Sequence, residues 1–217
     1  MSELLVSVRS ADEARLAARF AAWIDVKEPR RGSLGRADEA AWVAVASVLP
    51  PTASLTIALG GEGDPIPAAS AIPASVVAVK LAPRRSVTDW RQARQRWEAA
   101  AGRPLPWVTV LHADDPDLHA DLLAAGGEDG DRFVLVDTRD KSRGSSLSLL
   151  GRDGLERIVT QADGRRVAIA GRLSVDDLRH LADWPVILGV RSAACGGDRT
   201  GQLDPDALAE CVAAVRA

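Results

Sequence analysis

Three lysines are the residues of this sequence best suited to covalent chemistry. The chain has 27 basic residues, but only Lys27, Lys80 and Lys141 are lysines, and the rest are arginines. A lysine amine can attack a carbonyl carbon and form an imine, whereas the arginine guanidinium stays protonated and cannot. Each lysine in this arginine-rich chain is therefore a candidate nucleophile or base. The alternative is that one or more of them is an ordinary surface cation. The place of each lysine in the fold distinguishes these two roles.

Carboxylates accompany these lysines at short spacings. Asp25 lies two residues before Lys27 in an extended segment, so both side chains point to the same side. Asp137 lies four residues before Lys141. Amines that are close together and partly desolvated have lowered pKa values, which makes the free amine available, and nearby carboxylates hold the amines and shuttle protons. The alternative is a buried Lys–Asp network that only stabilises the fold.

Short apolar runs alternate with longer amphipathic stretches along the whole chain. Strands are expected at 4–8, within 23–29, and at 53–59, 75–82, 106–113, 132–138, 165–171 and 185–190. Helices are expected at 11–22, 38–48, 86–101, 115–125, 147–162, from Ser174 onward and at 204–216, with a weak one at most at 68–72. Ser10 is the expected N-cap of the first helix, and Glu13 would complete a capping box with it.

This alternation predicts an α/β fold, a single (β/α)8 TIM barrel domain that spans residues 1–217. Strands that alternate with helices form a parallel sheet, and eight strand–helix units favour closure into a barrel. An open, doubly wound sheet is the alternative. The first strand is not followed by a G-x-G-x-x-G motif, so a dinucleotide-binding fold has little support.

In such barrels the active site lies at the carboxyl ends of the strands and in the loops that follow them. Lys27 lies at the end of the second expected strand, and Lys80 ends the fourth. Asp137 ends the sixth strand, and Lys141 follows in its loop. All three lysines are thus expected at one rim of the barrel, where His112 also ends the fifth strand.

The loops after the seventh and eighth strands have the composition of a phosphate site. The segments AGRLS (170–174) and GVRSAACGGDRTG (189–201) are rich in small residues and lead toward helices. Backbone N–H groups at such places bind anions, and these two loops form the usual phosphate site of a barrel. The alternative is a merely flexible glycine loop. The residues expected to bind a substrate phosphate are Gly171, Arg172, Gly189, Arg191 and Ser192.

Composition excludes several other classes of protein. The net charge of -3 argues against a nucleic-acid partner. No apolar run approaches the roughly 20 residues needed to span a membrane, and the N-terminus does not have the pattern of a signal peptide. Two cysteines without metal-ligand spacing indicate a reduced, cytoplasmic chain, and Cys195 is expected to be a small packed residue. No metal or organic cofactor is expected, and assembly into a homo-oligomer is left open.

Five segments together resemble a known enzyme family. They are LLVSV (4–8), IDVKEPRRGSLG (24–35), VDTRDK (136–141), AIAGRL (168–173) and GVRSAACGGDRTGQLD (189–204). In order and spacing they resemble the (5-formylfuran-3-yl)methyl phosphate synthase family, also called 4-(hydroxymethyl)-2-furancarboxaldehyde-phosphate synthase. The sequence departs from the family pattern at GGEGDPIP, at Leu81–Ala82 after Lys80, and at His112, where the family has Tyr.

The resemblance implies a lyase that condenses two molecules of glyceraldehyde 3-phosphate, a small phosphorylated aldehyde, into a phosphorylated furan aldehyde. One phosphate and two waters are lost, and the product serves methanofuran-type or methylofuran-type one-carbon carriers. By matching motifs, Lys27 would form the Schiff base and Lys80 would be the general base. Asp25, Asp137 and Lys141 would be supporting acid–base residues.

Two other functions fit the same residues. One is another class I (Schiff-base) aldolase or sugar-phosphate lyase that uses Lys27 and the phosphate loops but stops at a different product. The other is a catalytically silent barrel that binds a sugar phosphate or a partner enzyme. The presence of both Lys27 and Lys80 speaks against the silent barrel, because a degenerate site in an arginine-rich chain is expected to lose one of them.

Overall fold

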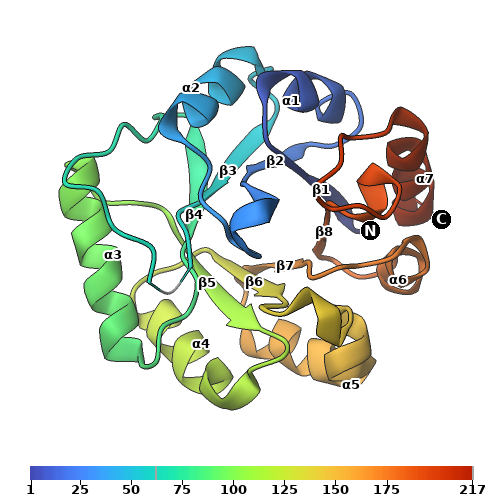
Figure 1. Cartoon of the computed structure of the whole chain (residues 1–217). Helices are drawn as coiled ribbons and strands as arrows, with labels where there is room; N and C mark the ends of the chain where they lie inside the picture. The colour runs from blue at the N-terminus through green and yellow to red at the C-terminus, as the bar shows by residue number, and fades with distance from the viewer. Residues whose placement is uncertain (62, 217) are drawn as a thin grey trace.

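Eight parallel strands close into a barrel with helices outside it (Figure 1). The computed structural model describes residues 1–61 and 63–216. In their order around the ring, the strands are β1 (Glu3–Val8), β2 (Trp23–Val26), β3 (Ser54–Ala58), β4 (Val76–Lys80), β5 (Trp107–His112), β6 (Phe133–Asp137), β7 (Arg166–Ile169) and β8 (Ile187–Val190). The ring closes because β8 pairs with β1. The predicted barrel is confirmed, and the open sheet is wrong.

Seven α-helices and four short 3-10 helices lie in the described connections. The α-helices are α1 (Ala11–Ala17), α2 (Glu39–Val48), α3 (Val87–Ala101), α4 (His119–Glu128), α5 (Ser146–Gln161), α6 (Val175–Leu181) and α7 (Pro205–Arg216). The 3-10 helices are η1 (Pro29–Arg31), η2 (Pro116–Leu118), η3 (Lys141–Arg143) and η4 (Ala193–Cys195). Each 3-10 helix follows the carboxyl end of a strand, so these short turns border the rim where the site was expected.

The expected weak helix at 68–72 is wrong. Between β3 and β4, residues 59–61 and 63–75 contain no helix. Pro65, Pro67 and Pro73 crowd this connection, and proline has no N–H to donate within a helix. Ile72 is nevertheless buried against the core, so the segment covers this side of the barrel as an irregular chain.

The ends of two other expected helices also differ from the structure. The first helix ends at Ala17 rather than continuing to residue 22, because 18–20 form a turn that leads into β2. The fifth expected helix begins as the 3-10 turn η2 and becomes α-helical only at His119. Both differences lie at helix ends, where turn geometry rather than the apolar pattern determines the first and last helical residue.

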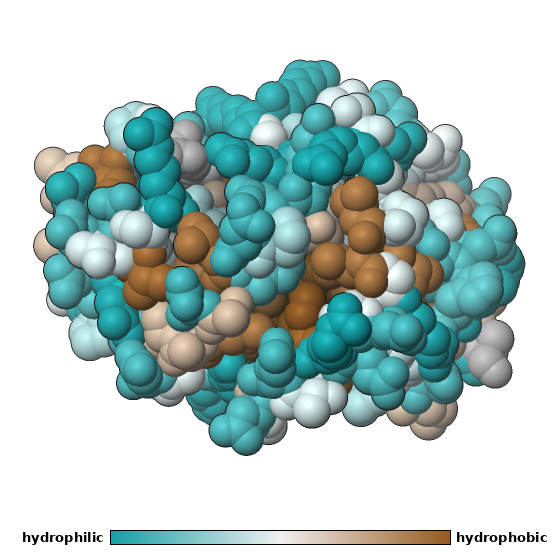
Figure 2. All heavy atoms as spheres, turned by 90° about the horizontal axis from the view of Figure 1, so that it is seen from below, coloured by the Kyte–Doolittle hydropathy of each residue, from teal (hydrophilic) through white to brown (hydrophobic). Residues whose placement is uncertain are grey.

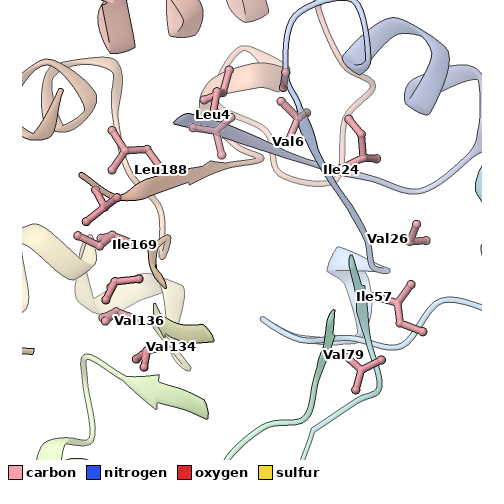
Figure 3. Close-up of a cluster of buried hydrophobic side chains, with 14 of the residues drawn as sticks. Leu4, Val6, Ile24, Val26, Ile57, Val79, Val134, Val136, Ile169 and Leu188 are labelled. Carbon is pink, nitrogen blue, oxygen red and sulfur yellow. The ribbon is translucent and has the colours of Figure 1, made fainter. Parts of the chain in front are cut away.

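Alternating side chains divide each strand between the helices and the barrel interior. In β1, Val6 and Val8 are fully buried against the helical layer, while Leu5 and Ser7 face inward. In β6, Val134 and Val136 belong to the outer core, and Asp137 faces inward. Figure 3 shows such outward side chains standing away from the middle of the ring. Burying each of these residues contributes about 1.5–3 kcal/mol, so the outer layer holds the strands that position the site.

Hydrophilic side chains cover most of the helical shell. Figure 2 shows the molecule from below the view of Figure 1, with apolar side chains in a furrow between hydrophilic ones. The large apolar side chains that are exposed are few, namely Met1, Val43 and Val77. In the described part of the chain, no helix combines the length and the apolar character needed to cross a membrane.

Candidate active site

Polar side chains gather inside the barrel at the carboxyl ends of β1 to β4. In the strand register, Ser7 lies beside Asp25, and Asp25 lies beside Thr56. Lys80 lies beside Ala58, which follows Thr56 by two residues in β3. Each of these polar residues follows the inward alternation of its strand. The carboxyl ends of four strands therefore bring their side chains to one level of the barrel mouth.

Asp25 and Lys80 form a buried ion pair at this level. The Lys80 ammonium donates to Asp25 Oδ1 and, at 3.0 Å, to Thr56 Oγ1. The Thr56 and Ser7 hydroxyls donate to the two oxygens of Asp25 at 2.9 and 3.3 Å. Burial lowers the pKa of Lys80 below its ordinary value of 10.5, although the Asp25 carboxylate opposes this shift. An amine with a lowered pKa is more often neutral and is able to accept a proton.

Asp137 and Lys141 form a second pair at the end of β6. The Lys141 ammonium donates to Asp137 Oδ1 and, at 2.8 Å, to Thr138 Oγ1. Burial alone would raise the pKa of Asp137, but the charges of Lys141 and Lys27 outweigh it and hold this pKa below its ordinary value. Burial also lowers the pKa of Lys141. Asp137 is therefore an anion that is able to balance positive charge in the pocket.

Lys27 differs from the other two lysines because its ammonium is unpaired. It is 8% exposed, and within residues 1–61 and 63–216 its Nζ has no hydrogen-bond or ion-pair partner. Lys27 lines both the cavity inside the barrel, with Asp25 and Lys80, and a smaller pocket at the rim, with Asp137 and Lys141. An unpaired amine that faces a pocket between two Lys–Asp pairs has the arrangement that imine formation requires.

The pocket at the rim is bordered by free backbone amides. The N–H groups of Gly171, Arg172, Arg191 and Ser192 donate to no other described residue. All four residues line the pocket. Unpartnered N–H groups that converge on a concave site favour an anion.

Gly171 is required by the geometry of this pocket. Its φ of 87° is left-handed, and an added Cβ would lie 2.3 Å from Ser146 Oγ and 2.8 Å from the backbone nitrogen of Thr138. Gly189 is also constrained, since its Cβ would lie 2.9 Å from that of Ala170. Small residues thus let the loops after β6, β7 and β8 approach one another around the pocket.

Arg191 has a different role from the one its sequence position suggested. Its guanidinium makes five hydrogen bonds inside the protein, to the carbonyls of Ser7, Arg199 and Gly201 and to both carboxylate oxygens of Glu13. A guanidinium has five N–H donors, so none is left for a ligand. Only the backbone N–H of Arg191 remains available to a phosphate.

Glu13 shows why the expected capping box is half wrong. Ser10 does cap α1, accepting from the Glu13 N–H at 3.3 Å. The Glu13 carboxylate does not return to the Ser10 N–H but binds the guanidinium of Arg191 and the backbone and side chain of Arg9. The buried guanidinium of Arg191 attracts this carboxylate more strongly than a neutral amide does. In α6, by contrast, Ser174 and Asp177 form a complete capping box.

Two other expected phosphate residues border the same pocket in different ways. Arg172 is exposed, adopts a left-handed φ of 58°, and donates from Nη1 to the Lys141 carbonyl at 2.8 Å. This bond ties the loop after β7 to the loop that holds Lys141. Ser192 is the N-cap of η4 and makes no capping hydrogen bond with its side chain.

Several residues at the site were not among those expected from the sequence. Ser7, Thr56 and Thr138 hold the carboxylates and amines, and Arg199 lines the rim pocket. Inward alternation near the strand ends was the available signal for Ser7 and Thr56. Arg199 lies in the glycine-rich loop 189–201 that was expected to bind phosphate, but its place at the pocket depends on how this loop folds back after β8.

His112 lies inside the ring at the end of β5, beside Asp137 of β6. It is 5% exposed, and its Nε2 has no hydrogen-bond partner among the described residues. Burial lowers the pKa of this imidazole, which favours its neutral form. Cys195 is buried, which matches the expected packed residue, and burial raises the pKa of its thiol.

No group of three or more His, Cys, Asp or Glu side chains that could hold a metal ion occurs in the described ranges. The polar residues of the site are instead arranged as amine–carboxylate pairs. These pairs can transfer protons at carbon and balance the charge of an anionic leaving group, and the unpaired Lys27 amine can form an imine.

Comparison with known sequences gives one family. Residues 4–212 match the family model described as 4-HFC-P synthase. A similar protein is the (5-formylfuran-3-yl)methyl phosphate synthase of Methanosarcina barkeri (strain Fusaro / DSM 804). It is 28% identical over 238 aligned positions, which cover 99% of this chain and 100% of that relative.

Comparison with solved structures gives other barrels. Phosphoribosyl anthranilate isomerase from Thermus thermophilus has a TM-score of 0.65 at 16% identity, with 98% of each chain covered. Thiamine phosphate pyrophosphorylase from Pyrococcus furiosus has a TM-score of 0.61 at 13% identity, covering 99% of this chain and 95% of that one. At these identities the likeness extends to the fold alone.

Proposed function

The chain belongs to the 4-HFC-P synthase family, and we propose that it joins two molecules of glyceraldehyde 3-phosphate into (5-formylfuran-3-yl)methyl phosphate through a Schiff base on Lys27. Two triose phosphates contain the atoms of this product plus one phosphate and two waters, so the reaction balances without an oxidant or reductant. The product then serves methanofuran-type or methylofuran-type one-carbon carriers.

The observation that supports this proposal most is the difference in pairing among the three lysines. Lys80 and Lys141 each hold a carboxylate, whereas the Lys27 amine has no partner among the described residues and lines both cavities. A nucleophile must be free to form a covalent bond, and a proton carrier benefits from a partner that balances its charge. The division of roles between Lys27 and its neighbours follows from this difference.

The first chemical step is attack of the Lys27 amine on the aldehyde carbon. A C–N bond forms, water leaves, and the resulting imine draws electrons from the neighbouring carbon. The neutral Lys80 amine then removes a proton from that carbon and becomes an ammonium ion, which Asp25 and Thr56 stabilise. The electron pair of the broken C–H bond enters the enamine.

The electron pair of the enamine expels phosphate from C3 of the same triose, which leaves an enol that is nucleophilic at C3. This carbon bonds to C2 of the second triose phosphate, which reacts as its ketone isomer after proton transfer from its C2 to its C1. The C1 hydroxyl of the second triose then closes the ring on C2 of the first, and two dehydrations, each removing a proton from carbon and a hydroxyl as water, complete the furan. Lys141 and Asp137 lie at the rim pocket and serve these proton transfers. Formation of the aromatic ring drives the sequence forward, and hydrolysis of the imine returns Lys27.

The rim pocket supports a phosphorylated substrate rather than a neutral one. The free N–H groups of Gly171, Arg172, Arg191 and Ser192 offer hydrogen bonds to phosphate oxygens, and Lys141 supplies nearby positive charge. Phosphate held there keeps the aldehyde end of the molecule within reach of Lys27, which lines the same pocket. Gly189 makes room for this arrangement because it carries no side chain.

Incubation of the purified protein with glyceraldehyde 3-phosphate alone tests the proposal. We expect furan-aldehyde absorbance and one phosphate released for every two trioses consumed. A six-carbon aldol product without furan would indicate another Schiff-base aldolase on the same barrel. Binding of the triose phosphate without any turnover would indicate a silent binding protein, and both outcomes contradict the proposal.

A further inference from the structure

Arg199 is a partly buried cation without an acidic partner. It lies in the loop between β8 and α7 and lines the rim pocket with Lys27 and Lys141. Within the described residues, its side chain makes one hydrogen bond, from Nη2 to the carbonyl of Gly32 at 2.8 Å, and no ion pair. Arg94 and Arg191, the buried arginines, each bind a carboxylate. Arg199 therefore has donors and a charge that the protein leaves unused.

Two arginine side chains hold the backbone around Arg199 in place. The carbonyls of residues 199, 200 and 201 accept hydrogen bonds in turn from Arg191, Arg9 and Arg191 again. Both of these arginines are held by the same carboxylate, that of Glu13. Because these three consecutive carbonyls all accept hydrogen bonds from Arg9 and Arg191, the backbone of the loop that carries Arg199 is fixed.

The Gly32 carbonyl that Arg199 binds belongs to a segment that covers the barrel mouth. Residues 28–37 follow β2 and lie over the middle of the ring in Figure 1. Leu34 of this segment is 2% exposed and packs inside the barrel against Ala58, Ala78 and Val110. The bond from Arg199 thus joins the cover of the mouth, 28–37, to the loop that borders the rim pocket.

We propose that Arg199 binds the phosphate of the substrate with the N–H groups that Gly32 leaves free, and that it thereby couples phosphate binding to the stability of the cover segment 28–37. The inference rests on the proposed function only in taking the substrate to be phosphorylated. Arg199 is then a further phosphate-binding residue, and the cover segment 28–37 responds to the phosphate.

The shape of the guanidinium is what permits this double contact. Its N–H groups point outward in a planar fork, so one edge binds the Gly32 carbonyl while another binds two phosphate oxygens. Burial lowers the pKa of Arg199, but an arginine stays protonated near neutral pH. Lysine at this position would keep the charge but not the fork.

Binding of inorganic phosphate, measured by calorimetry, is the first half of the test. We expect R199Q to bind phosphate about tenfold to a hundredfold more weakly than the wild type, because a charge-assisted hydrogen bond is lost. R15Q, which removes an exposed arginine of α1 that is paired with Asp12, is the matched control and should bind as the wild type does. Equal affinity in R199Q and the wild type would overturn the proposal.

Hydrogen exchange of the peptide that covers 28–37 is the second half. Saturating phosphate should slow exchange of this peptide in the wild type and in R15Q, but not in R199Q or R199K. Protection in R199K equal to that in the wild type would overturn the coupling through the fork, and unchanged exchange in the wild type would overturn the coupling altogether. Neither readout requires turnover. Absence of furan in the wild type would therefore refute the proposed function without touching this result.

Discussion

Lys80 is the residue that we propose as the general base, and burial lowers its pKa. It is 4% exposed and hydrogen-bonded to Asp25 and Thr56. Replacement by arginine keeps the positive charge but removes the ability to accept a proton. We expect K80R to lose furan formation by about a hundredfold or more, the usual contribution of general base catalysis. Turnover is followed by furan absorbance.

The same variant separates binding from proton transfer. Because Lys27 is unchanged in K80R, borohydride should still trap an imine with glyceraldehyde 3-phosphate in this variant. Normal turnover of K80R would remove Lys80 from the mechanism. Loss of the trapped imine would mean that the substitution disturbs the pocket more widely than proposed.

If Lys80 is the base, its pairing with Asp25 should determine the pH at which activity is lost. A base must be neutral, so kcat should fall as the pH drops through the pKa of Lys80. Burial lowers this pKa and Asp25 opposes the shift, so loss of the carboxylate lowers the pKa further. We therefore expect the acid limb of the kcat profile to move to lower pH in D25N. If the acid limb of the kcat profile of D25N stays at the wild-type pH or moves to higher pH, the Asp25–Lys80 pair does not control this pH dependence.

Sequence reasoning identified the lysines and carboxylates but not their pairing. The spacing of Asp25 and Lys27 predicted only that both side chains point to the same side, and in the structure Asp25 binds Lys80 of β4. That partnership depends on the register between strands, which a single sequence does not specify. The same limit applies to Arg191, whose buried partner Glu13 lies on a helix far away in sequence.

At the scale of elements, Glu13 of α1 supports the loop after β8. Its carboxylate binds Arg191 and Arg9, which together hold three carbonyls of residues 199–201. Removing one member of a buried ion pair leaves an uncompensated charge, so E13Q should lower the free energy of unfolding by about 3 kcal/mol. Urea denaturation of the wild type and E13Q measures this difference.

The pH dependence of that difference follows from the pKa of Glu13. Burial would raise it, but the two arginines outweigh burial and hold it below its ordinary value of 4.5. A carboxyl whose pKa is lowered by folding stabilises the protein above its unfolded pKa, and this contribution is lost as the pH falls through the folded pKa. The gap between wild type and E13Q should therefore be full at pH 6 to 7 and should shrink below pH 4.5. A gap that grows on acidification would contradict this assignment.

Gly171 in the loop after β7 offers a second element-scale prediction. An added Cβ would clash with Ser146 and Thr138, so we expect G171A to lose about 1–3 kcal/mol of stability and to bind inorganic phosphate more weakly. G164A is the matched control, since Gly164 also has a left-handed φ, of 77°, but has open space around its Cβ. Equal phosphate affinity in G171A and G164A would mean that the close approach of the loops does not shape the pocket.

Most elements could be predicted from the alternation of apolar and polar residues, and the failures have local causes. The connection 63–75 lacks the expected helix because three prolines occupy it, although Ile72 is apolar enough to be buried. The Ser10 capping box failed because a distant arginine competes for Glu13. Local propensity therefore predicts where an element begins more reliably than which partner its side chains select.

At the scale of the molecule, closure of the barrel is what assembles the site. Pairing of β1 with β8 brings Ser7 close to Arg191, and it places the loops after β7 and β8 beside Lys27 and Lys141. The eight strands, most of them followed by a helix, made the barrel predictable from sequence. The insertion of Leu34 into its mouth was not predictable, because a lone leucine in a glycine-rich loop carries no signal of where it packs.

The most direct test of the central claim is borohydride reduction of the protein in the presence of glyceraldehyde 3-phosphate, followed by peptide mass spectrometry. The unpaired amine of Lys27 predicts one stable adduct, on the peptide that contains Lys27, and none on Lys80 or Lys141. Absence of any adduct in a protein that still consumes the substrate, or an adduct on another lysine, would contradict the assignment of Lys27 as the Schiff-base residue.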